Sequence, residues 1–451
     1  MITQDTIAAI STPLGEGGIG IVRLSGRDAI AIASGMFVSS TGRGLEQGRV
    51  FHGHVMDGAG RTIDEVLLHV MRGPKSYTCE DVIEINAHGG SGPLAAILEQ
   101  ALARGARLAR PGEFTLRAFL NGRIDLVQAE AVIDQIRAKS DAGLRAAAAA
   151  ANGAVSVAIN EIKQTLVDAL ARIEAAVDFP DEDMPDLVTQ ALRGEIEQAL
   201  SRVNEMLSTA EAGRLYREGA SIAIAGEPNV GKSSLFNALL RDARAIVSAI
   251  PGTTRDRIEE TISLNGVPVR LTDTAGLRTT EDEIERIGVD IAREAVRTAD
   301  IVLYVLDAQS ADTAMPDALT GVERPVWVVL NKMDLAPNAP APTWAAGLAG
   351  ISCVSAHTSE GLHELEAALG SFLLGSADVV PEKGLINRAH QRESLRRAQG
   401  ALEQVIANFD ASPELLSVDV REALSALGEI TGETTPDDVL EVIFSSFCVG
   451  K

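Results

Sequence analysis

Short apolar runs alternate with stretches of helical periodicity along much of this chain of 451 residues. Four runs, at 221–225, 267–271, 326–330 and 351–354, have the length and composition of buried strands. The segment 234–240, which follows the first run closely, has apolar residues at helical spacing. Strands that alternate with helices predict an α/β domain with a mostly parallel sheet.

The chain before residue 118 is also predicted to be α/β. A strand is expected over 19–24, a hairpin over 52–70 that turns at Asp57-Gly58, and a helix over 92–107. The segment 15–20 matches G-x-G-x-x-G, but it runs into a strand instead of a helix, so no dinucleotide site is predicted there.

Two histidines, His52 and His54, fall on one face of a predicted strand. Neighbouring positions offer no carboxylate or cysteine that would complete a set of metal ligands. Ordinary strand histidines are the favoured interpretation.

Helical periodicity dominates two stretches that are far apart in the sequence. The first is rich in alanine and includes six consecutive alanines at 146–151, the strongest helix former available. An acidic interruption at 178–185 is interpreted as an inter-helix loop in preference to a cation site. Helical periodicity returns after residue 385, so one helical domain interrupted by an inserted domain is the simplest organisation.

Four segments are therefore predicted. They are an N-terminal α/β domain (1–118), a first helical part (119–215), an inserted α/β domain (216–375) and a second helical part (376–451).

Composition excludes some classes of protein. The apolar content of 46% is enough for packed cores, and three scattered cysteines predict a reducing, cytoplasmic environment without disulfides. No signal peptide or membrane span is predicted. The net charge of −23 makes the chain a poor binder of nucleic acid by itself, so an RNA substrate would be held largely by a partner.

The polar motif after the first apolar run has a recognisable chemistry. Gly226-Glu-Pro-Asn-Val-Gly-Lys-Ser233 is a complete G-x-x-x-x-G-K-[ST] phosphate loop between a predicted strand and a predicted helix. Its glycines allow successive amides to face one anion, and the helix adds its positive end. Lys232 is expected at the β- and γ-phosphates, and the Ser233 hydroxyl at Mg²⁺.

The next polar motifs predict the base and complete the metal site. Asn331-Lys-Met-Asp334 offers a carboxylate that can accept two hydrogen bonds from guanine, where adenine would leave it unpaired. Asp273-Thr-Ala-Gly276 places an acid near Mg²⁺, and Thr254 is expected to reach Mg²⁺ and the γ-phosphate. The segment 216–375 is thus predicted to bind GTP through Asn229, Val230, Gly231, Lys232, Ser233, Ser234, Ser248, Thr253, Thr254, Asp273, Thr274, Ala275, Gly276, Asn331, Lys332, Asp334, Ser355 and Ala356.

The group that activates water is not fixed by the residues alone. Leu277 stands where many GTPases have a glutamine, and an aliphatic side chain cannot orient water. The acids at 281–285 are candidates among which spacing does not choose. Asn229, together with carbonyls of the loop 248–256, is equally compatible with a monovalent cation site beside the phosphates and with hydrogen bonds inside its own loop.

With these residues in hand, the whole chain resembles one family, the bacterial tRNA uridine 5-carboxymethylaminomethyl modification GTPases (the MnmE/TrmE family). The phosphate-loop motif and Asp273-Thr-Ala-Gly-Leu-Arg278 are shared with ribosome-assembly GTPases. Ile284-Glu-Arg-Ile-Gly288 is a further mark of the family. The more specific marks are Arg110-Pro-Gly-Glu-Phe114, Ala118-Phe-Leu-Asn-Gly-Arg123 and the terminus Phe447-Cys-Val-Gly-Lys451.

The resemblance implies a fold, cofactors and site residues. The fold would be a Ras-like, doubly wound GTPase domain inserted into a helical domain and preceded by an α/β folate-binding and dimerisation domain. A tetrahydrofolate (5,10-methylene or 5-formyl) would contact Arg23, Glu80, Arg123 and Lys451, although each alone would more often be a surface charge. Arg123 stands where the family has a lysine, and His357 departs from the usual basic residue. Cys448 is as compatible with packing as with a chemical role.

The resemblance also implies a mechanism and partners. Glu285 would be the catalytic acid, and Asn229 would ligate K⁺ with the support of Ser248, Ile250 and Thr253. A homodimer would act with an FAD-dependent partner of the MnmG/GidA family, as a heterotetramer or larger complex, on the wobble uridine of certain tRNAs. The alternatives are a ribosome-assembly or rRNA-binding GTPase, and a folate-dependent methyltransferase with a vestigial GTPase.

Overall fold

The computed structural model describes most of the chain, namely residues 5–13, 15–42, 44–46, 48–178, 188–244, 259–273, 294–310, 314–375 and 380–451. The chain divides into two compact units. One comprises Met1–Ile133, Ala150–Thr189 and Ala407–Lys451, and the other Asp134–Ala149 and Gln190–Ile406. Both units are thus assembled from segments that are far apart in the sequence.

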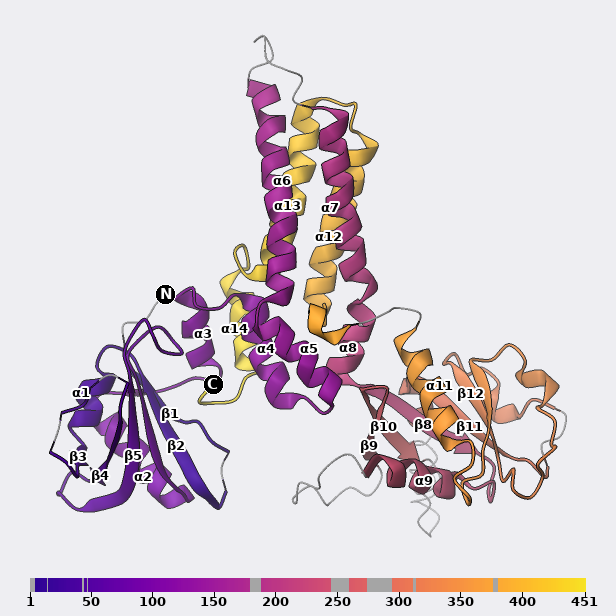
Figure 1. Cartoon of the computed structure of the whole chain (residues 1–451), viewed down its shortest axis with the longest axis horizontal. Coiled ribbons are helices and arrows are strands. Elements are labelled where there is room, and N and C mark those ends of the chain that lie inside the picture. The colour runs from indigo at the N-terminus through magenta and orange to yellow at the C-terminus, as the bar shows by residue number, and fades with distance from the viewer. Residues whose placement is uncertain are drawn as a thin grey trace. The chain divides into compact units, whose positions relative to one another are not determined.

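The first unit contains a seven-stranded sheet (Figure 1). Its strands are β1 (Ile7–Ile10), β2 (Gly17–Ser25), β3 (Phe37–Ser39), β4 (Val50–Met56), β5 (Thr62–Met71), β6 (Val82–Gly89) and β7 (Arg107–Leu108), in the order β3-β4-β5-β6-β2-β1-β7. Neighbouring strands are antiparallel except β1 and β7. The helices α1 (Ala29–Ser34) and α2 (Ser91–Ala103) pack on the sheet and bury Leu94 and Ile97.

Most elements predicted for this sheet are confirmed. The strand at 19–24 lies in β2, which begins inside the G-x-G-x-x-G match, and the hairpin is β4–β5. The helix predicted over 92–107 ends at Ala103 instead, because Gly105 adopts a left-handed φ of 102° and Arg107 pairs with β1.

The surroundings of His52 also differ from expectation. Its Nε2 lies 2.7 Å from Glu65 Oε1 on the neighbouring strand, so a carboxylate does stand beside it. Sequence spacing could not show this, because strand pairing brings the two residues together. No group of three or more potential metal ligands occurs in the described ranges.

Helices from both ends of the chain complete the first unit. They are α3 (Glu113–Leu120), the start of α4 (Leu126–Arg137), α6 (Ala154–Asp178), α13 (Pro413–Thr431) and α14 (Asp437–Ser445). Helix α6 packs along α13, burying side chains that include Leu166 and Leu427, and Lys163 pairs with Glu433 at 2.5 Å. The helical stretches on either side of the inserted domain therefore pack together, as the periodicity predicts.

The second unit contains a six-stranded sheet in the order β13-β12-β11-β8-β10-β9. Its strands are β8 (Ala220–Gly226), β9 (Glu259–Leu264), β10 (Val267–Asp273), β11 (Ile301–Asp307), β12 (Val326–Asn331) and β13 (Gly350–Cys353). All neighbours are parallel except the edge strand β9, which joins β10 through the Asn265-Gly266 turn.

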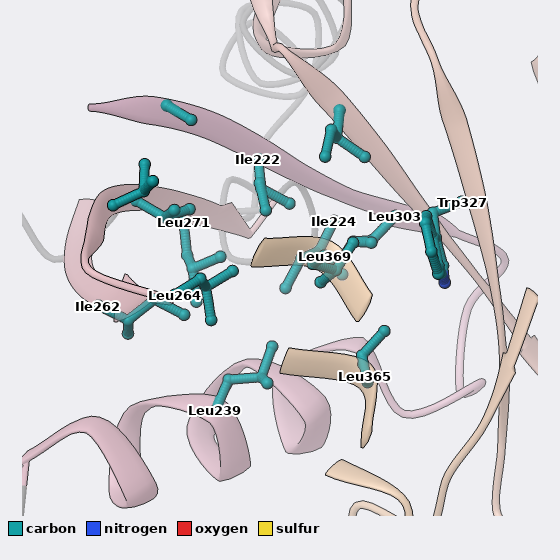
Figure 2. Packing of buried hydrophobic residues seen from close by; sticks show 14 of the residues in the cluster. Ile222, Ile224, Leu239, Ile262, Leu264, Leu271, Leu303, Trp327, Leu365 and Leu369 are labelled. Atoms are coloured by element: carbon teal, nitrogen blue, oxygen red, sulfur yellow. The ribbon is translucent and has the colours of Figure 1, made fainter. Parts of the chain in front are cut away.

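A continuous apolar core holds this sheet to its helices. Figure 2 shows Ile222, Ile224 and Leu303 of the sheet facing Leu239 of α9 (Lys232–Arg244) and Leu365 of α11 (Leu362–Leu374). All five side chains are at most 1% exposed. Such burial rigidly fixes the strand ends from which the polar motifs emerge.

Four further helices belong mainly to the second unit. They are α5 (Asp141–Ala151), α7 (Gln190–Ser208), α8 (Ala210–Glu218) and α12 (Ala389–Ala407), with short 3₁₀ turns at Asp317–Leu319, Thr343–Ala345 and Pro381–Lys383. Gln399 of α12 donates to Asn204 of α7 at 2.8 Å. Segments before and after the inserted sheet thus pack together in this unit too.

No single helix in the described part of the chain is both long and apolar enough to cross a membrane, and only the bent pair α5 and α6 meets the length and composition test jointly.

Candidate functional site

The phosphate loop has the strand–loop–helix setting that its motif requires. Strand β8 ends at Gly226 and helix α9 begins at Lys232. Both glycines have left-handed φ values, 143° at Gly226 and 96° at Gly231. A Cβ would lie 2.4 Å from Val305 O at the first and 2.2 Å from Asn331 Nδ2 at the second, so only glycine fits either position.

Lys232 and Ser233 are the first two residues of α9, and both side chains form polar contacts. Lys232 is 8% exposed, and its Nζ donates to the carbonyls of Gly226 at 2.9 Å and Glu227 at 2.6 Å, so the ammonium lies inside the loop. The Ser233 hydroxyl donates to Asp273 Oδ2 at 2.8 Å. Ser233 and Asp273 meet because β8 and β10 pair in parallel. Both side chains offer the hard oxygens that Mg²⁺ prefers.

The predicted base motif is bound to the phosphate loop. Asn331 is 1% exposed; its Nδ2 donates to Val230 O and its Oδ1 accepts from Ala356 N, both at 3.0 Å. Ser355 donates to Asp334 Oδ1 at 2.6 Å, which orients the exposed Asp334 carboxylate. Residues from three separate loops are therefore locked into one site.

Other predicted residues fall at the margins of this site. Asn229 is exposed with φ 64°, Ser234 is exposed in the first turn of α9, and His357 is exposed beside Ala356. The predicted residues Ser248, Ile250, Thr253, Thr254, Thr274, Ala275, Gly276 and Glu285 lie outside the described residues.

Sequence reasoning missed Asp307, the last residue of β11. Its Oδ2 accepts from Lys332 Nζ at 2.7 Å, and Lys332 Nζ also donates to Asn229 O at 2.8 Å. Burial alone would raise the pKa of Asp307, but the hydrogen bonds from Lys332 and the Gln309 amide hold that pKa below its usual value. The sequence did contain a signal for this residue: an acid ends the apolar run at 301–307, and Asp307 pairs in register with Asn331.

The predicted folate residues lie in the first unit, where the C-terminal tail meets β2 and α3. Arg23 donates to Glu84 Oε1 at 2.9 Å and to Gly450 O at 3.1 Å. Lys451 is half-buried, and its carbonyl accepts from Phe114 N at 3.2 Å. Cys448 is exposed, and its carbonyl accepts from Gly112 N at 3.3 Å.

Of the other two candidates, Glu80 lies on the loop that precedes β6, and Arg123 follows α3 and contacts that loop at Tyr77. Glu80 accepts from Ser25 Oγ at 2.7 Å and from Arg117 Nη1 at 3.0 Å. Arg123 is exposed, donates to Tyr77 O at 3.1 Å and lies over the Tyr77 ring at 4.9 Å. All four candidates thus lie near α3, at the C-terminal tail or at the loop that precedes β6.

A buried charge network supports this region and was not predicted. Arg117 is 6% exposed and bonds to Asp5, Glu80 and Glu113. Although burial disfavours the Glu113 carboxylate, hydrogen bonds from Arg107 and from the Arg110 amide keep its pKa below the usual value. The pairings are invisible in the sequence because Asp5 and Arg117 are 112 positions apart.

Comparison with known proteins places the chain. A family model described as the MnmE helical domain matches residues 126–448, and one described as the GTP-binding protein TrmE N-terminus matches residues 6–123. The tRNA modification GTPase MnmE of Geotalea uraniireducens (strain Rf4) is 44% identical over 457 residues, covering 100% of both chains. That of Chloroflexus aurantiacus (strain ATCC 29366 / DSM 635 / J-10-fl) is 47% identical, covering 99% of this chain and 100% of the relative. The chain belongs to the MnmE family of tRNA modification GTPases.

Membership of the MnmE family confirms the resemblance and the predicted fold class, and it makes the chain a GTP hydrolase. Among solved structures, a variant of Era from Aquifex aeolicus bound to GDP.AlF4- is 26% identical, covering 40% of this chain and 66% of that chain with a TM-score of 0.28. That likeness supports no further conclusion. For an MnmE-family GTPase that binds GTP and Mg²⁺, the ammonium of Lys232 and the oxygens of Ser233 and Asp273 have the chemistry that these ligands need.

Proposed function

We propose that this chain is a K⁺-activated GTPase that acts in tRNA modification with a flavin-dependent partner. Together they would form an aminomethyl-type group on C5 of the wobble uridine, using a one-carbon unit from a tetrahydrofolate. The observation that supports this best is the joining of the guanine motif to the phosphate loop, in a chain similar over its full length to proteins named tRNA modification GTPase MnmE. The full-length similarity favours this function over ribosome assembly.

Hydrolysis would use the residues of the phosphate loop and of β10. GTP supplies the γ-phosphate that water attacks, releasing GDP and phosphate. Lys232 would neutralise charge on the β- and γ-phosphate oxygens, while Ser233 and Asp273 would hold the Mg²⁺ side of the site. Asp334 would bind guanine through its two carboxylate oxygens, and Thr254 would support Mg²⁺ and the γ-phosphate.

Glu285 is proposed to orient the attacking water, because the family resemblance assigns the catalytic acid to Ile284-Glu-Arg-Ile-Gly288 and Leu277 cannot take that role. Glu285→Ala should lower hydrolysis at least tenfold and leave the GTP dissociation constant within about twofold, since the acid would act on water and not on the nucleotide. Loss of affinity together with turnover would mean that the residue is structural.

Asn229 is proposed as a K⁺ ligand, with Ser248, Ile250 and Thr253 on the supporting loop. It is exposed on the phosphate loop, and Lys332 fixes its carbonyl at 2.8 Å. A cation beside the β- and γ-phosphates would replace the arginine that other GTPases use. Turnover should be much faster in KCl than in NaCl, and Asn229→Ala should abolish the difference. Equal wild-type rates in both salts would contradict the proposal.

Arg23, Glu80, Arg123 and Lys451 are proposed to bind the tetrahydrofolate. Carboxylates can pair with the pterin edge, and cations with the glutamate tail. Arg23→Ala should weaken 5-formyltetrahydrofolate binding at least tenfold in calorimetry, because Arg23 also holds the tail at Gly450. The matched control is Arg27→Ala, whose side chain is 70% exposed. Equal affinities of both variants would remove Arg23 from the site.

The partner, the tRNA and the oligomeric state complete the proposal. The chain would act as a homodimer in the cytoplasm, with an FAD-dependent protein of the MnmG/GidA family holding much of the tRNA, because a net charge of −23 disfavours binding phosphates alone. A reconstitution with folate labelled at its one-carbon unit tests this directly. Label should enter tRNA uridine only when chain, partner and GTP are all present, and incorporation without this chain would contradict the proposal.

A further inference from the structure

Asp307 lies next to the nucleotide site without belonging to any of its sequence motifs. It ends β11 and pairs in register with Asn331 of β12, which places its carboxylate beside the base motif. One carboxylate oxygen accepts from the main-chain N–H of Gln309 at 3.0 Å, and the other accepts from Lys332 Nζ at 2.7 Å. The hydrogen bond from Gln309 fixes the position of the Asp307 carboxylate, and the carboxylate in turn fixes the position of the Lys332 ammonium.

Lys332 passes this constraint to the phosphate loop. Its Nζ donates to the carbonyl of Asn229 at 2.8 Å, and the neighbouring Asn331 donates to the carbonyl of Val230 at 3.0 Å. Two consecutive residues of the base motif therefore hold two consecutive carbonyls of the phosphate loop. A lysine side chain has a flexible four-carbon stem, so a fixed counter-charge decides where its ammonium rests.

The backbone at both ends of this connection is strained. Asn229 and Lys332 each have a φ of 64°, in the left-handed region that residues other than glycine seldom adopt. Such conformations are costly for residues other than glycine and persist only where surrounding contacts impose them. The hydrogen bond from Lys332 to Asn229 joins the two strained residues, and Asp307 lies behind it with a side chain that is 16% exposed.

We infer that Asp307 is a positioning residue: through Lys332 it holds the main chain of Asn229 in the conformation that presents the Asn229 side chain to a monovalent cation and the loop amides to phosphate. The inference rests on the proposed K⁺ site for its first readout, a potassium titration, and on guanine-nucleotide binding for its second readout, GDP affinity. The competing interpretation is an ion pair that only stabilises the fold.

A potassium titration of GTP turnover separates these interpretations. Asp307→Asn keeps the shape of the side chain and its bond to Gln309 but removes the charge that holds Lys332. The half-saturating K⁺ concentration should rise about tenfold, while kcat at saturating K⁺ stays within about twofold. Asp307→Glu, which keeps the charge, should lie closer to the wild type. An unchanged half-saturating concentration in a K⁺-dependent wild type would overturn the inference.

Glu323→Gln is the matched control. It also removes one negative charge, but it lies in the loop that precedes β12, at the opposite end of that strand from the nucleotide site. It should titrate like the wild type. Thermal unfolding of each variant shows that the comparison is made on folded protein, and a purely stabilising ion pair would lower the melting temperature without moving the K⁺ dependence.

A second readout decides the case in which the wild type turns over equally fast in KCl and NaCl. That result would remove the proposed K⁺ site and leave Asp307 to be judged by GDP affinity, measured in NaCl with the same proteins. A GDP dissociation constant about tenfold higher in Asp307→Asn than in Glu323→Gln would support the positioning of the loop amides. Equal constants would overturn it.

Discussion

Replacing Asn331 by alanine tests the joint between the base motif and the phosphate loop. The side chain is 1% exposed, and both of its polar ends are used, at Val230 O and at Ala356 N. Each hydrogen bond contributes about 1 kcal/mol net, and a buried partner left unpaired costs about 1–3 kcal/mol. The substitution should therefore destabilise the second unit by about 2–4 kcal/mol.

The two tryptophans make this measurable in the full chain. Trp327 and Trp344 both lie in the second unit, and Trp327 is 7% exposed in the core shown in Figure 2. Urea unfolding followed by tryptophan fluorescence therefore reports on this unit, which avoids a two-state assumption for the whole chain. The transition of Asn331→Ala should shift to lower urea.

GDP affinity provides the functional half of the same test. Without Asn331 the loop carbonyl at Val230 loses its anchor, so the GDP dissociation constant should rise by at least tenfold. The exposed Asn338 gives a matched control, and Asn338→Ala should behave like the wild type in both assays. If Asn331→Ala unfolds at the wild-type urea concentration and binds GDP normally, the joint contributes neither stability nor affinity and the reasoning is wrong.

Two further predictions concern the second unit. Burial and the charges of Arg388 and Arg217 lower the pKa of His390 from 6.5 to about 4. The depressed pKa means that the folded state holds the His390 ring neutral, while the unfolded state takes up a proton below pH 6.5. The free energy of unfolding is therefore highest above pH 6.5 and falls as the pH drops toward 4. At pH 5 this loss is about 2 kcal/mol. Urea unfolding should show that the free energy of unfolding falls by about 2 kcal/mol less between pH 7 and pH 5 in His390→Gln than in the wild type. Equal losses in the two proteins would refute this prediction. Gly266→Ala should destabilise the Trp-monitored transition by about 1–3 kcal/mol more than Gly321→Ala, because both have left-handed φ values but only the first would place a Cβ 2.6 Å from Ala142. Equal losses would show that this contact is unimportant.

The motifs were predictable because their chemistry depends on a few neighbouring residues. The glycines at 226 and 231 and the Asn265-Gly266 turn need conformations that local sequence indicates, and the structure has them. The apolar runs predicted strands β8, β10, β12 and β13 for the same reason.

Contacts between distant segments were not predictable in this way. Asp307 meets Lys332 because two parallel strands pair in one register, and Glu65 meets His52 through a hairpin register. Arg117 meets Asp5 and Glu80 because α3 packs beside the start of β1. Periodicity indicates which face of an element is buried, but it does not name the partner across the interface.

The central claim is that the joined guanine and phosphate motifs serve the modification of wobble uridine. The most direct test is mass spectrometry of tRNA nucleosides from cells that lack this chain and are complemented with the wild type or with Asp334→Asn. The account predicts that the C5-modified uridine disappears in the deletion, returns with the wild type and stays low with Asp334→Asn. A normal modified-uridine profile in cells without the chain would contradict it.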